Sequence, residues 1–450
     1  MESFKIKPLK EPPAVCVRVP GSKSITNRAM LLAAMGEGTT LLKGVQFSED
    51  SLYFMKALQD MGFDVQADQE ACTIRVRGFG GHIPREHATI YVGSAGTAAR
   101  FLTAFAAMSN GRYRFNASEQ MSKRPMRELF QALEELGARF TWLGDPYRFP
   151  MEIHGMGRRI GEYRIQLNID RSSQFLSALL LTAPLAMDLL TVELTGKRSA
   201  RSYVKMTERM MRQFGHSGVL KHGEDCYQVR RASYHAMEYT VEPDVSAACY
   251  FYAAAAMTGG SAIVRYMQKD SLQGDMRFLD VLEKMGCKRQ WGRMEETGEP
   301  ALKITGPEQG KLKGIEVDMS DFSDQTLTLA AIAPFADGPV TVHGVGHIRR
   351  QESDRLQAIV NELKRMGIQC EMLEDGVTIY PGTPVGAQIE TYQDHRVAMS
   401  FALTGLRTEG VEILNPECCR KTFAEYFTVF AKVFKQNKHQ EGNIGYEGNH

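Results

Sequence analysis

Residues 22–38, SKSITNRAMLLAAMGEG, begin with small, polar and charged residues, continue as an alanine-rich apolar stretch and end on glycine. Five later stretches follow the same pattern, and the six openings stand between 71 and 79 residues apart. A spacing this regular indicates one supersecondary unit that is used six times. The openings are Ser24, Gly96, Ser173, Val245, Asp324 and His395.

A second pattern repeats with the same period, because an amphipathic stretch closes on an apolar residue and glycine in each of the first five units. In IVNELKRMG and its counterparts the apolar residues recur at helical spacing, which predicts a helix with one buried stripe and a glycine cap. Strand-like segments follow, so each unit is predicted to run strand, helix, strand, helix, strand, strand. The glycines are Gly62, Gly137, Gly215, Gly286 and Gly367.

Length and composition narrow the class of protein. A chain of 450 residues is too long for one core and favours two domains, and a net charge of +1 with 24% charged residues is not typical of nucleic-acid binding. The eight cysteines show neither CxxC pairs nor zinc spacing, which indicates reduced thiols in the cytoplasm. The start, MESFKIKPLKEPP, lacks an apolar signal core, so we expect neither export nor a membrane span.

Basic residues stand at several of the predicted helix starts. Lys23 and Arg28 follow a Pro-Gly turn in PGSKSITNR. Arg100 follows the glycine-rich turn of YVGSAGTAAR, and Arg124 precedes a proline in SKRPM. A cation in the first turns opposes the helix dipole, whereas an anionic ligand there is favoured by both the dipole and the cation. We therefore expect these helix starts to bind anions.

The C-terminal half adds two carboxylates and more cations. Asp324 opens the fifth alanine-rich helix, where a simple helix cap is the alternative. Glu352 and Arg355 stand three residues apart, which on a helix places them on one face, where a solvated surface pair is the alternative. Arg396 and Lys421 supply further positive charge. No metal-ligand spacing occurs, so we expect no metal centre.

Nine blocks, in the same order along the chain to about residue 432, resemble the 5-enolpyruvylshikimate-3-phosphate (EPSP) synthase family. Members of that family join phosphoenolpyruvate to shikimate 3-phosphate in the pathway to chorismate and the aromatic amino acids. The blocks are PGSKSITNRAMLLAAM, GSAGTAAR, KRPM, SSQFLSALL, VEPDVSAACYFYAAAA, SDQTLTLAA, ESDRL, DHRVAMSFAL and KTF.

The resemblance implies an α/β, two-domain enolpyruvyl transferase fold with six repeated βαβαββ-type units, three per domain, helices inside and sheets outside. One domain would comprise residues 1–20 and 243–433, the other residues 21–242, and residues 434–450 would be a flexible tail. It also implies a monomeric cytoplasmic transferase that uses no cofactor, binds neither nucleic acid nor membrane, and is a target of glyphosate.

The resemblance further assigns roles to individual residues. Asp324 matches the general base for the 5-hydroxyl, Glu352 matches the acid that protonates the enol carbon, and Lys23 belongs to the same catalytic set. The positions that match the shikimate 3-phosphate site are Lys23, Ser24, Arg28, Ser172, Ser173, Gln174, Tyr203, Asp324, His347 and Gln351. The positions that match the phosphoenolpyruvate site are Lys23, Gly96, Arg100, Arg124, Gln174, Arg355, Arg396 and Lys421.

The chain departs from the family pattern at the end of the site that would hold the acceptor. Gln351 stands where many members have a lysine, which we interpret as altered affinity rather than lost function. His347 stands where asparagine is common. In SARSYV, Tyr203 matches a substrate-contacting tyrosine, but Ser199, Ala200 and Ser202 leave the accompanying serine ambiguous.

Three alternatives remain at this point. One is an enolpyruvyl transferase for a different shikimate-like acceptor. Another is UDP-N-acetylglucosamine enolpyruvyl transferase, but the reactive cysteine loop of that enzyme has no counterpart near SKRPM. The third is a non-catalytic homologue that binds anions, which would lack an acid or base, whereas Asp324, Glu352 and Lys421 are all present.

Overall fold

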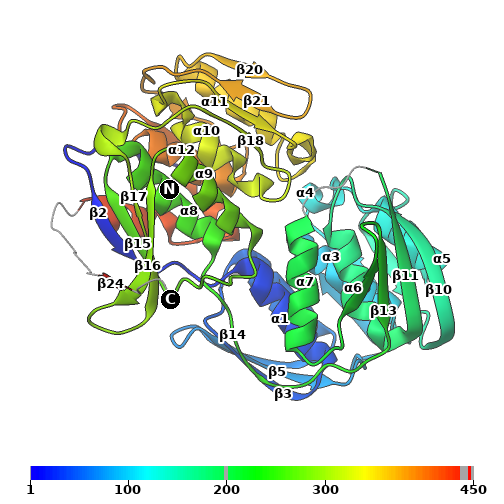
Figure 1. Cartoon of the computed structure of the whole chain (residues 1–450). Coiled ribbons are helices and arrows are strands. Elements are labelled where there is room, and N and C mark those ends of the chain that lie inside the picture. The colour runs from blue at the N-terminus through cyan, green and yellow to red at the C-terminus, as the bar shows by residue number, and fades with distance from the viewer. Residues whose placement is uncertain (1, 197–200, 436–443, 447–450) are drawn as a thin grey trace. The chain divides into compact units, whose positions relative to one another are not determined.

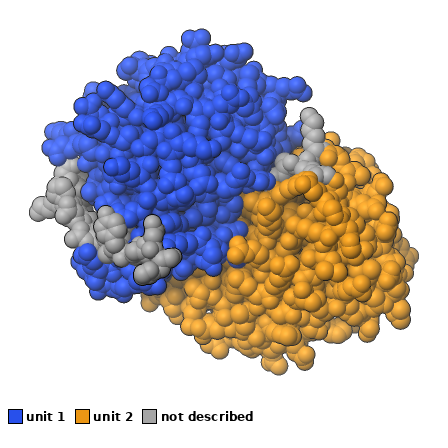
Figure 2. Space-filling model, viewed as in Figure 1, with its two compact units in different colours: residues 1–20, 242–450 blue, residues 21–241 orange. Residues whose placement is uncertain are grey.

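The computed structural model describes residues 2–196, 201–435 and 444–446 (Figure 1). The chain forms two compact units (Figure 2). Unit 1 comprises Met1–Pro20 and Glu242–His450, and unit 2 comprises Gly21–Val241. No helix in the described part of the chain is long and apolar enough to cross a membrane. Ser199 and Ala200, which the sequence left as candidates beside Tyr203, lie outside the described residues.

Unit 2 contains three α/β repeats, each with its own four-stranded sheet. The first consists of β14 (Glu238–Thr240), α1 (Lys23–Met35), β3 (Glu37–Lys43), α2 (Glu49–Asp60), β4 (Asp64–Asp68) and β5 (Thr73–Phe79). The second consists of β6 (His87–Tyr91), α3 (Gly96–Ala107), β7 (Arg112–Asn116), α4 (Glu119–Ser122), α5 (Arg127–Glu135), β8 (Arg139–Trp142) and β9 (Met151–His154). The third consists of β10 (Arg159–Asn168), α6 (Gln174–Ala186), β11 (Met187–Thr195), α7 (Arg201–Gln213), β12 (Val219–His222) and β13 (Cys226–Arg230).

Unit 1 repeats the arrangement. Its first repeat has β2 (Ala14–Val17), α8 (Val245–Thr258), β15 (Ser261–Arg265), α9 (Arg277–Lys284), β16 (Lys288–Met294) and β17 (Pro300–Thr305). Its second has β18 (Ile315–Asp318), α10 (Thr326–Ile332), β19 (Val340–His343), α11 (Arg355–Arg365), β20 (Cys370–Met372) and β21 (Val377–Ile379). Its third has β22 (Gln388–Ile389), α12 (His395–Thr404), β23 (Glu412–Leu414) and α13 (Tyr426–Lys435). Short 3₁₀ turns link them: η1 (Gly274–Met276), η2 (Glu308–Gly310), η3 (Ser323–Gln325), η4 (Ala333–Phe335), η5 (Gly346–Arg350) and η6 (Pro416–Lys421).

Five of the six sheets place the four strands of their repeat in one order. The first two strands of a repeat pair in parallel, and the last two form an antiparallel hairpin whose second strand lies next to the second strand of the repeat, as in β6-β7-β9-β8. The strands alternate buried and exposed residues, as in β5, which is typical of a sheet with one solvated face. The predicted order of elements within the repeat is therefore confirmed.

The alanine-rich helices form the centre of each unit. In unit 1, α8, α10 and α12 each contact the other two, and in unit 2, α3 contacts both α1 and α6. A helix that is apolar on every side belongs in a core, and α8 is buried along almost its whole length. Small alanine side chains allow such helices to approach closely. The second helices of the first five repeats, α2, α5, α7, α9 and α11, each contact one or more of these central helices. The predicted cap glycines 62, 137, 215, 286 and 367 all have positive φ.

The last repeat differs from the others at its hairpin. No hairpin follows α13 in the described residues, and β1 (Ser3–Lys5), from the start of the chain, pairs antiparallel with β23 to complete that sheet. The expected flexible tail is also corrected in part, because β24 (Ile444–Tyr446) pairs with β16 as a fifth strand of its sheet. The unpaired backbone groups of β16 at the sheet edge explain why this segment can pair there.

Candidate functional site

Asp324 is the centre of a cluster of charged residues in unit 1. It lies in the turn η3 just before α10, and its Oδ1 lies 3.0 Å from Nη1 of Arg355. Its Oδ2 lies 2.8 Å from Nη2 of Arg396, which belongs to the first turn of α12. The carboxylate is 17% exposed, so the two arginines hold it without removing it from solvent.

Arg355, the first residue of α11, also binds Asp394, the N-cap of α12. Its Nε and Nη2 donate to the two carboxylate oxygens at 2.8 and 3.2 Å, a bidentate pair in which Asp394 is fully buried. Burial raises the pKa of Asp394, but the guanidinium of Arg355 outweighs it and holds that pKa below its usual range. The pair therefore ties the starts of two helices together.

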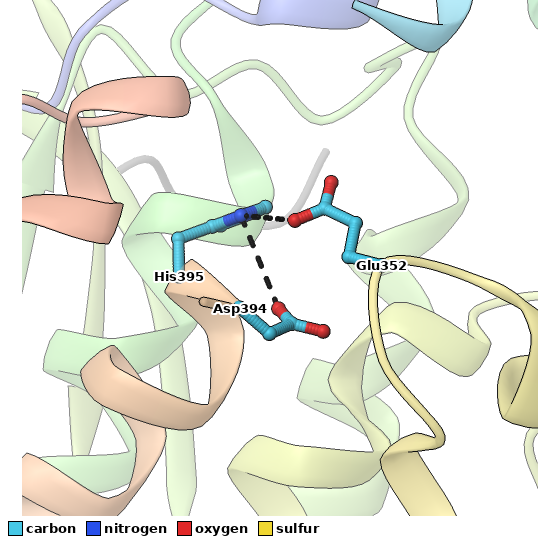
Figure 3. A group of neighbouring side chains, drawn as sticks. All are labelled: Glu352, Asp394 and His395. Atoms are coloured by element: carbon cyan, nitrogen blue, oxygen red, sulfur yellow. Dashed lines mark ion pairs between the residues drawn. The ribbon is translucent and has the colours of Figure 1, made fainter. Parts of the chain in front are cut away.

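Glu352 forms a second cluster, with His395 (Figure 3) and with Lys421. One carboxylate oxygen lies 2.9 Å from Nδ1 of His395 and the other 3.1 Å from Nζ of Lys421. Burial raises the pKa of Glu352, but His395 and then Lys421 lower it more, so the pKa lies well below its usual range. These two neighbours therefore favour the ionised form of Glu352.

Glu352, Asp394 and His395 lie close enough together to be considered as metal ligands, since their donor atoms lie within 4.8 Å of one another (Figure 3). The two carboxylates already have cationic partners, because Lys421 binds Glu352 and Arg355 binds both oxygens of Asp394. A metal ion would have to compete with these side chains. The arrangement fits an organic anion that shares the cations better than it fits a metal.

The predicted helical pairing of Glu352 with Arg355 is wrong. Glu352 lies in the bend between η5 and α11, and only Arg355 is helical. The two side chains turn to different partners, and neither forms the solvated surface pair that was the alternative. Asp354, as the N-cap of α11, accepts from the N–H of Gln357 and starts the helix after Glu352, which explains the difference.

A strained turn positions the start of α12. Tyr392 and Gln393 have φ of 53° and 55°, in the left-handed region that non-glycine residues seldom adopt. The buried carboxylate of Glu362 holds this turn, because it accepts from the hydroxyl of Tyr392 at 2.7 Å and from the N–H of Glu390 at 3.1 Å. The next residue, Asp394, and its neighbour His395 are thereby fixed in direction.

His347 and Gln351, two of the predicted acceptor-binding residues, lie in or next to η5. His347 Nε2 lies 2.8 Å from the hydroxyl of Ser323, and burial lowers the pKa of this imidazole. The amide oxygen of Gln351 accepts a hydrogen bond from Nη1 of Arg355. Gln351 thus contacts a residue of the predicted phosphoenolpyruvate set, a contact that the sequence did not predict.

This contact leads to a prediction for Gln351→Lys. A lysine cannot accept from Arg355, and it would place a second cation beside that guanidinium. The resemblance assigns Arg355 to the phosphoenolpyruvate site, so the variant is expected to raise the KM for that ligand about three- to tenfold, since a hydrogen bond to a charged group is lost. Steady-state kinetics with each substrate varied in turn measures this. A tighter KM for the acceptor with an unchanged KM for phosphoenolpyruvate would instead favour a direct contact of residue 351 with the acceptor.

Unit 2 holds its own group of cations at the start of α1. Lys23 Nζ lies 3.0 Å from Oδ2 of Asp50, and Lys23 keeps 20% of its side chain exposed. Arg28 is 1% exposed, and its Nε donates to the hydroxyl of Thr207 at 2.8 Å. Burial lowers the pKa of Arg28 to about 10, and none of the described residues gives it a carboxylate. A buried arginine with only neutral partners is suited to an anionic ligand.

The main-chain and ring contacts of Arg28 fix its direction. Its Nη1 donates to the carbonyl of Ser24, and its Nη2 lies 3.5 Å from the carbonyl of Tyr203 in α7. Its guanidinium also lies 5.1 Å from the ring centre of Phe101 and 5.9 Å from that of Tyr203. The structure thus brings Ser24, Arg28 and Tyr203 together, as one half of the predicted acceptor site requires.

The second group of cations in unit 2 surrounds Gly96. Arg100, in the second turn of α3, is 2% exposed, and its Nη1 donates to Oε1 of Gln174 at 2.8 Å. Burial, and then the nearby Arg124, lower the pKa of Arg100. A methyl group on Gly96 would lie 2.6 Å from Arg100 Nη1 and 3.0 Å from Arg124 Nη1. Two guanidinium groups therefore converge on a glycine, which favours a doubly charged ligand at this helix start.

The serines before α6 are also close by. Ser172 accepts from the N–H of Gln174 at 3.3 Å, and Ser173, the N-cap, is buried. The hydroxyls and Gln174 lie at the start of a helix, where free N–H groups favour an anion. Within unit 2, Gln174 therefore links the predicted serines to Arg100.

Sequence reasoning missed several partners of the site residues. Asp50 and Thr207 contact Lys23 and Arg28 from other elements, and Asp394 supports Arg355. Asp394 was visible in the DHR block, but nothing in the sequence indicated its partner. Asp275 was not singled out, and it joins the Asp324 cluster through Gln325.

Comparison with solved structures gives the class of protein. The EPSP synthase of Acinetobacter baumannii superposes with a TM-score of 0.79 at 27% identity, over 96% of this chain and 98% of that one. The enolpyruvyl transferase NikO of Streptomyces tendae has the same fold, with a TM-score of 0.73 at 15% identity over 96% of this chain. The chain thus has the enolpyruvyl transferase fold.

Sequence comparison gives the family. The family model described as EPSP synthase (3-phosphoshikimate 1-carboxyvinyltransferase) matches residues 12–430. The 3-phosphoshikimate 1-carboxyvinyltransferase of Nostoc punctiforme is 43% identical over 97% of this chain and all of that protein. The protein named 3-phosphoshikimate 1-carboxyvinyltransferase 2 of Halalkalibacterium halodurans is 37% identical over 98% of this chain and 96% of its own length. The chain belongs to the EPSP synthase family.

Proposed function

We propose that this protein transfers the enolpyruvyl group of phosphoenolpyruvate to the 5-hydroxyl of shikimate 3-phosphate and releases phosphate. The observation that carries the proposal is the pair of carboxylates in unit 1, Asp324 and Glu352, each set against two cationic or ionisable basic side chains. Anionic substrates that take over those cations would leave the carboxylates free for proton transfer. No cofactor takes part, because the reaction needs only proton transfers and one group transfer.

The reaction has two stages. In the addition, the 5-hydroxyl oxygen bonds to C2 of phosphoenolpyruvate while Asp324 accepts the hydroxyl proton and Glu352 donates a proton to C3. In the elimination, the C2–O bond to phosphate breaks, Glu352 takes a proton back from C3, Asp324 passes the hydroxyl proton to the departing phosphate, and the enolpyruvyl ether remains. Asp324 thus acts as base and Glu352 as acid, and the family resemblance assigns Lys23 to the same catalytic set.

Glu352 must carry a proton to act as an acid, although its neighbours His395 and Lys421 favour its charged form. Its pKa is low because His395 and Lys421 stabilise the charged form. A bound phosphoenolpyruvate would draw Lys421 toward its own negative charge, and the pKa of Glu352 would rise. Substrate binding would then prepare the acid, which gives Lys421 a role in both binding and catalysis.

The cations of the two units are assigned to the anionic groups of the substrates. Arg28, with Ser24 and Tyr203 beside it, binds the acceptor carboxylate, and the hydroxyls of Ser172 and Ser173 bind its phosphate. The phosphate and carboxylate of phosphoenolpyruvate are assigned to the residues that converge on Gly96 and to the cations of unit 1. These are Lys23, Arg100, Arg124, Gln174, Arg355, Arg396 and Lys421.

Phosphate release measured with purified protein, phosphoenolpyruvate and shikimate 3-phosphate tests the proposal. We expect release that depends on both substrates and an enolpyruvyl product of the corresponding mass. Release with an unphosphorylated or otherwise substituted shikimate, and none with shikimate 3-phosphate, would assign the chain to a different acceptor. Binding of both anions without release would identify the non-catalytic homologue.

Light scattering in the same buffer tests the further proposal that the protein is a monomer, and cell fractionation tests the proposal that it acts in the cytoplasm.

Gly96→Ala is expected to weaken the binding of glyphosate more than the binding of phosphoenolpyruvate. The added methyl would displace the guanidinium groups of Arg100 and Arg124, and glyphosate is the longer of the two anions. The inhibition constant of glyphosate is expected to rise at least tenfold, about 1.4 kcal/mol, and the KM for phosphoenolpyruvate by less. Competition kinetics measures both constants. Gly144→Ala, in an exposed loop where the methyl meets only ordinary contacts, is the control. Equal losses for both ligands would show that Gly96 does not line this site.

A further inference from the structure

Asp275 is a buried carboxylate next to the Asp324 cluster that the proposed mechanism leaves unused. It lies in η1 of unit 1 and is 6% exposed. Its Oδ2 accepts hydrogen bonds from the hydroxyl of Ser246 and from Nε2 of Gln325, the latter at 2.9 Å. Gln325 directly follows Asp324, so Asp275 holds the turn that presents the proposed base.

A second chain of contacts leads from Asp275 to the arginine of the cluster. The hydroxyl of Ser246, in the first turn of α8, lies 3.4 Å from Nη2 of Arg396. The same Nη2 lies 2.8 Å from Oδ2 of Asp324. Asp275 is therefore linked to both members of the Asp324–Arg396 pair. Gln325 connects it to Asp324, and Ser246 connects it to Arg396.

The segment that carries Asp275 is itself fixed in place. Glu242 accepts from the hydroxyl of Ser271 at 2.6 Å and from the N–H of Leu272. Gln273 donates to the carbonyl of Pro243 at 2.8 Å and accepts from the N–H of Val245, at the start of α8. Because α8 also carries Ser246, Asp275 and its hydrogen-bond partner belong to one rigid corner of unit 1.

Electrostatics couples Asp275 to Asp324. Burial and then the charge of Asp324 raise the pKa of Asp275 to about 6, while Arg396 and the hydrogen bonds from Ser246 and Gln325 oppose the rise. Such coupling is mutual, so a negative Asp275 makes Asp324 harder to ionise. Other titratable or charged groups that act on these two carboxylates, or on which they act, include Arg355, His347, Tyr250 and Cys249.

We propose that Asp275 is a positioning residue for the proposed base: it orients Asp324 and Arg396 through Gln325 and Ser246, and its negative charge strengthens the basicity of Asp324. The inference rests on the proposed role of Asp324. A base that abstracts a hydroxyl proton works better when its proton affinity is raised toward the working pH. Asp275 supplies that effect without touching the substrate.

The test is the pH dependence of kcat for Asp275→Asn, measured by phosphate release. This variant keeps the size of the side chain and removes its charge. The acidic limb of the profile is expected to move to lower pH by about 0.5 to 1 unit, because Asp324 loses a like charge. We also expect kcat at its optimum to fall about tenfold, with both KM values within about threefold of the wild type.

Asp280→Asn is the matched control. Asp280 lies on α9, close to Asp275 in sequence, and pairs at 54% exposure with Arg289. This substitution removes the same charge from the same unit and is expected to leave both the acidic limb of the pH profile and the value of kcat unchanged. A limb that moves equally in both variants would assign the effect to net charge and contradict the proposal.

Ser246→Ala covers the case in which Asp275→Asn does not fold, as judged by calorimetry. The alanine removes the hydroxyl that links Asp275 to Arg396, and kcat is expected to fall about three- to tenfold with little change in either KM. The proposal is overturned if Asp275→Asn folds and leaves both kcat and the acidic limb unchanged. It is equally overturned if Asp275→Asn does not fold and Ser246→Ala matches the wild type in kcat. A wild-type protein without phosphate release, or a fully active Asp324→Asn, would instead contradict the proposed function itself.

Discussion

Asp324→Asn and Glu352→Gln are each expected to lower turnover by about 10²- to 10⁴-fold, the usual contribution of a general acid or base. Each amide keeps the shape of the side chain and can no longer transfer the proton. Asp324→Asn also frees Arg355 and Arg396 from a competing carboxylate, so the KM for phosphoenolpyruvate should not rise. Rapid-quench experiments measure the rate of the chemical step, and steady-state phosphate release measures kcat and KM.

The control for this pair is Glu316→Gln, because Glu316 lies in the same unit and its side chain is 77% exposed. Its turnover should equal that of the wild type. Turnover within about threefold of the wild type for Asp324→Asn or Glu352→Gln would remove that residue from the mechanism. A loss confined to KM would assign the residue to binding.

Arg355→Met is expected to lower the free energy of unfolding of unit 1 by about 3–5 kcal/mol, because it leaves the fully buried Asp394 without its cation. Adding Asp394→Asn to the variant should restore part of the loss, since the buried charge is then removed. Urea unfolding can be followed in unit 1 alone. The chain has two tryptophans, and a Trp142→Phe background leaves Trp291 of β16 as the reporter.

The difference in the free energy of unfolding between the wild type and Arg355→Met should also depend on pH. Arg355 holds the pKa of Asp394 below its ordinary value, so the pair stabilises the folded state above about pH 4 and loses its effect as the pH falls through the lowered pKa. The difference in the free energy of unfolding between the wild type and the variant should therefore become smaller at acidic pH. Lys364→Met, an exposed change on the same helix, is the control. A gap that stays the same at all pH values would show that Arg355 stabilises by packing rather than by charge.

Local sequence patterns predicted the helices and their capping because both depend on neighbours in the chain. The alanine-rich openings mark helix starts to within two residues, and the glycines that follow the second helices have the positive φ that caps require. Asp324 is the exception in detail, since it lies in a 3₁₀ turn before α10 rather than in the helix.

The pairings within the site could not be predicted in the same way. Arg355 and Asp394 are 39 residues apart, and Asp275 and Gln325 are 50 apart, so no periodicity connects them. The sequence placed the cations at helix starts, but which carboxylate each one binds depends on how the repeats pack. The assumed i, i+3 pairing of Glu352 and Arg355 failed for this reason, because the helix begins only after Glu352.

The strand at the very start of the chain has a consequence for how the protein is made. Unit 2 is one continuous segment, so all of its strands have been synthesised once residue 241 has left the ribosome. In contrast, β1 pairs with β23, whose residues lie some 400 positions later, which at roughly 5–20 residues per second means a wait of about 20 to 80 s. During that interval β1 has no partner strand, whereas β15 (Ser261–Arg265), the partner of β2, is synthesised earlier, so the first strand to be translated is among the last to pair.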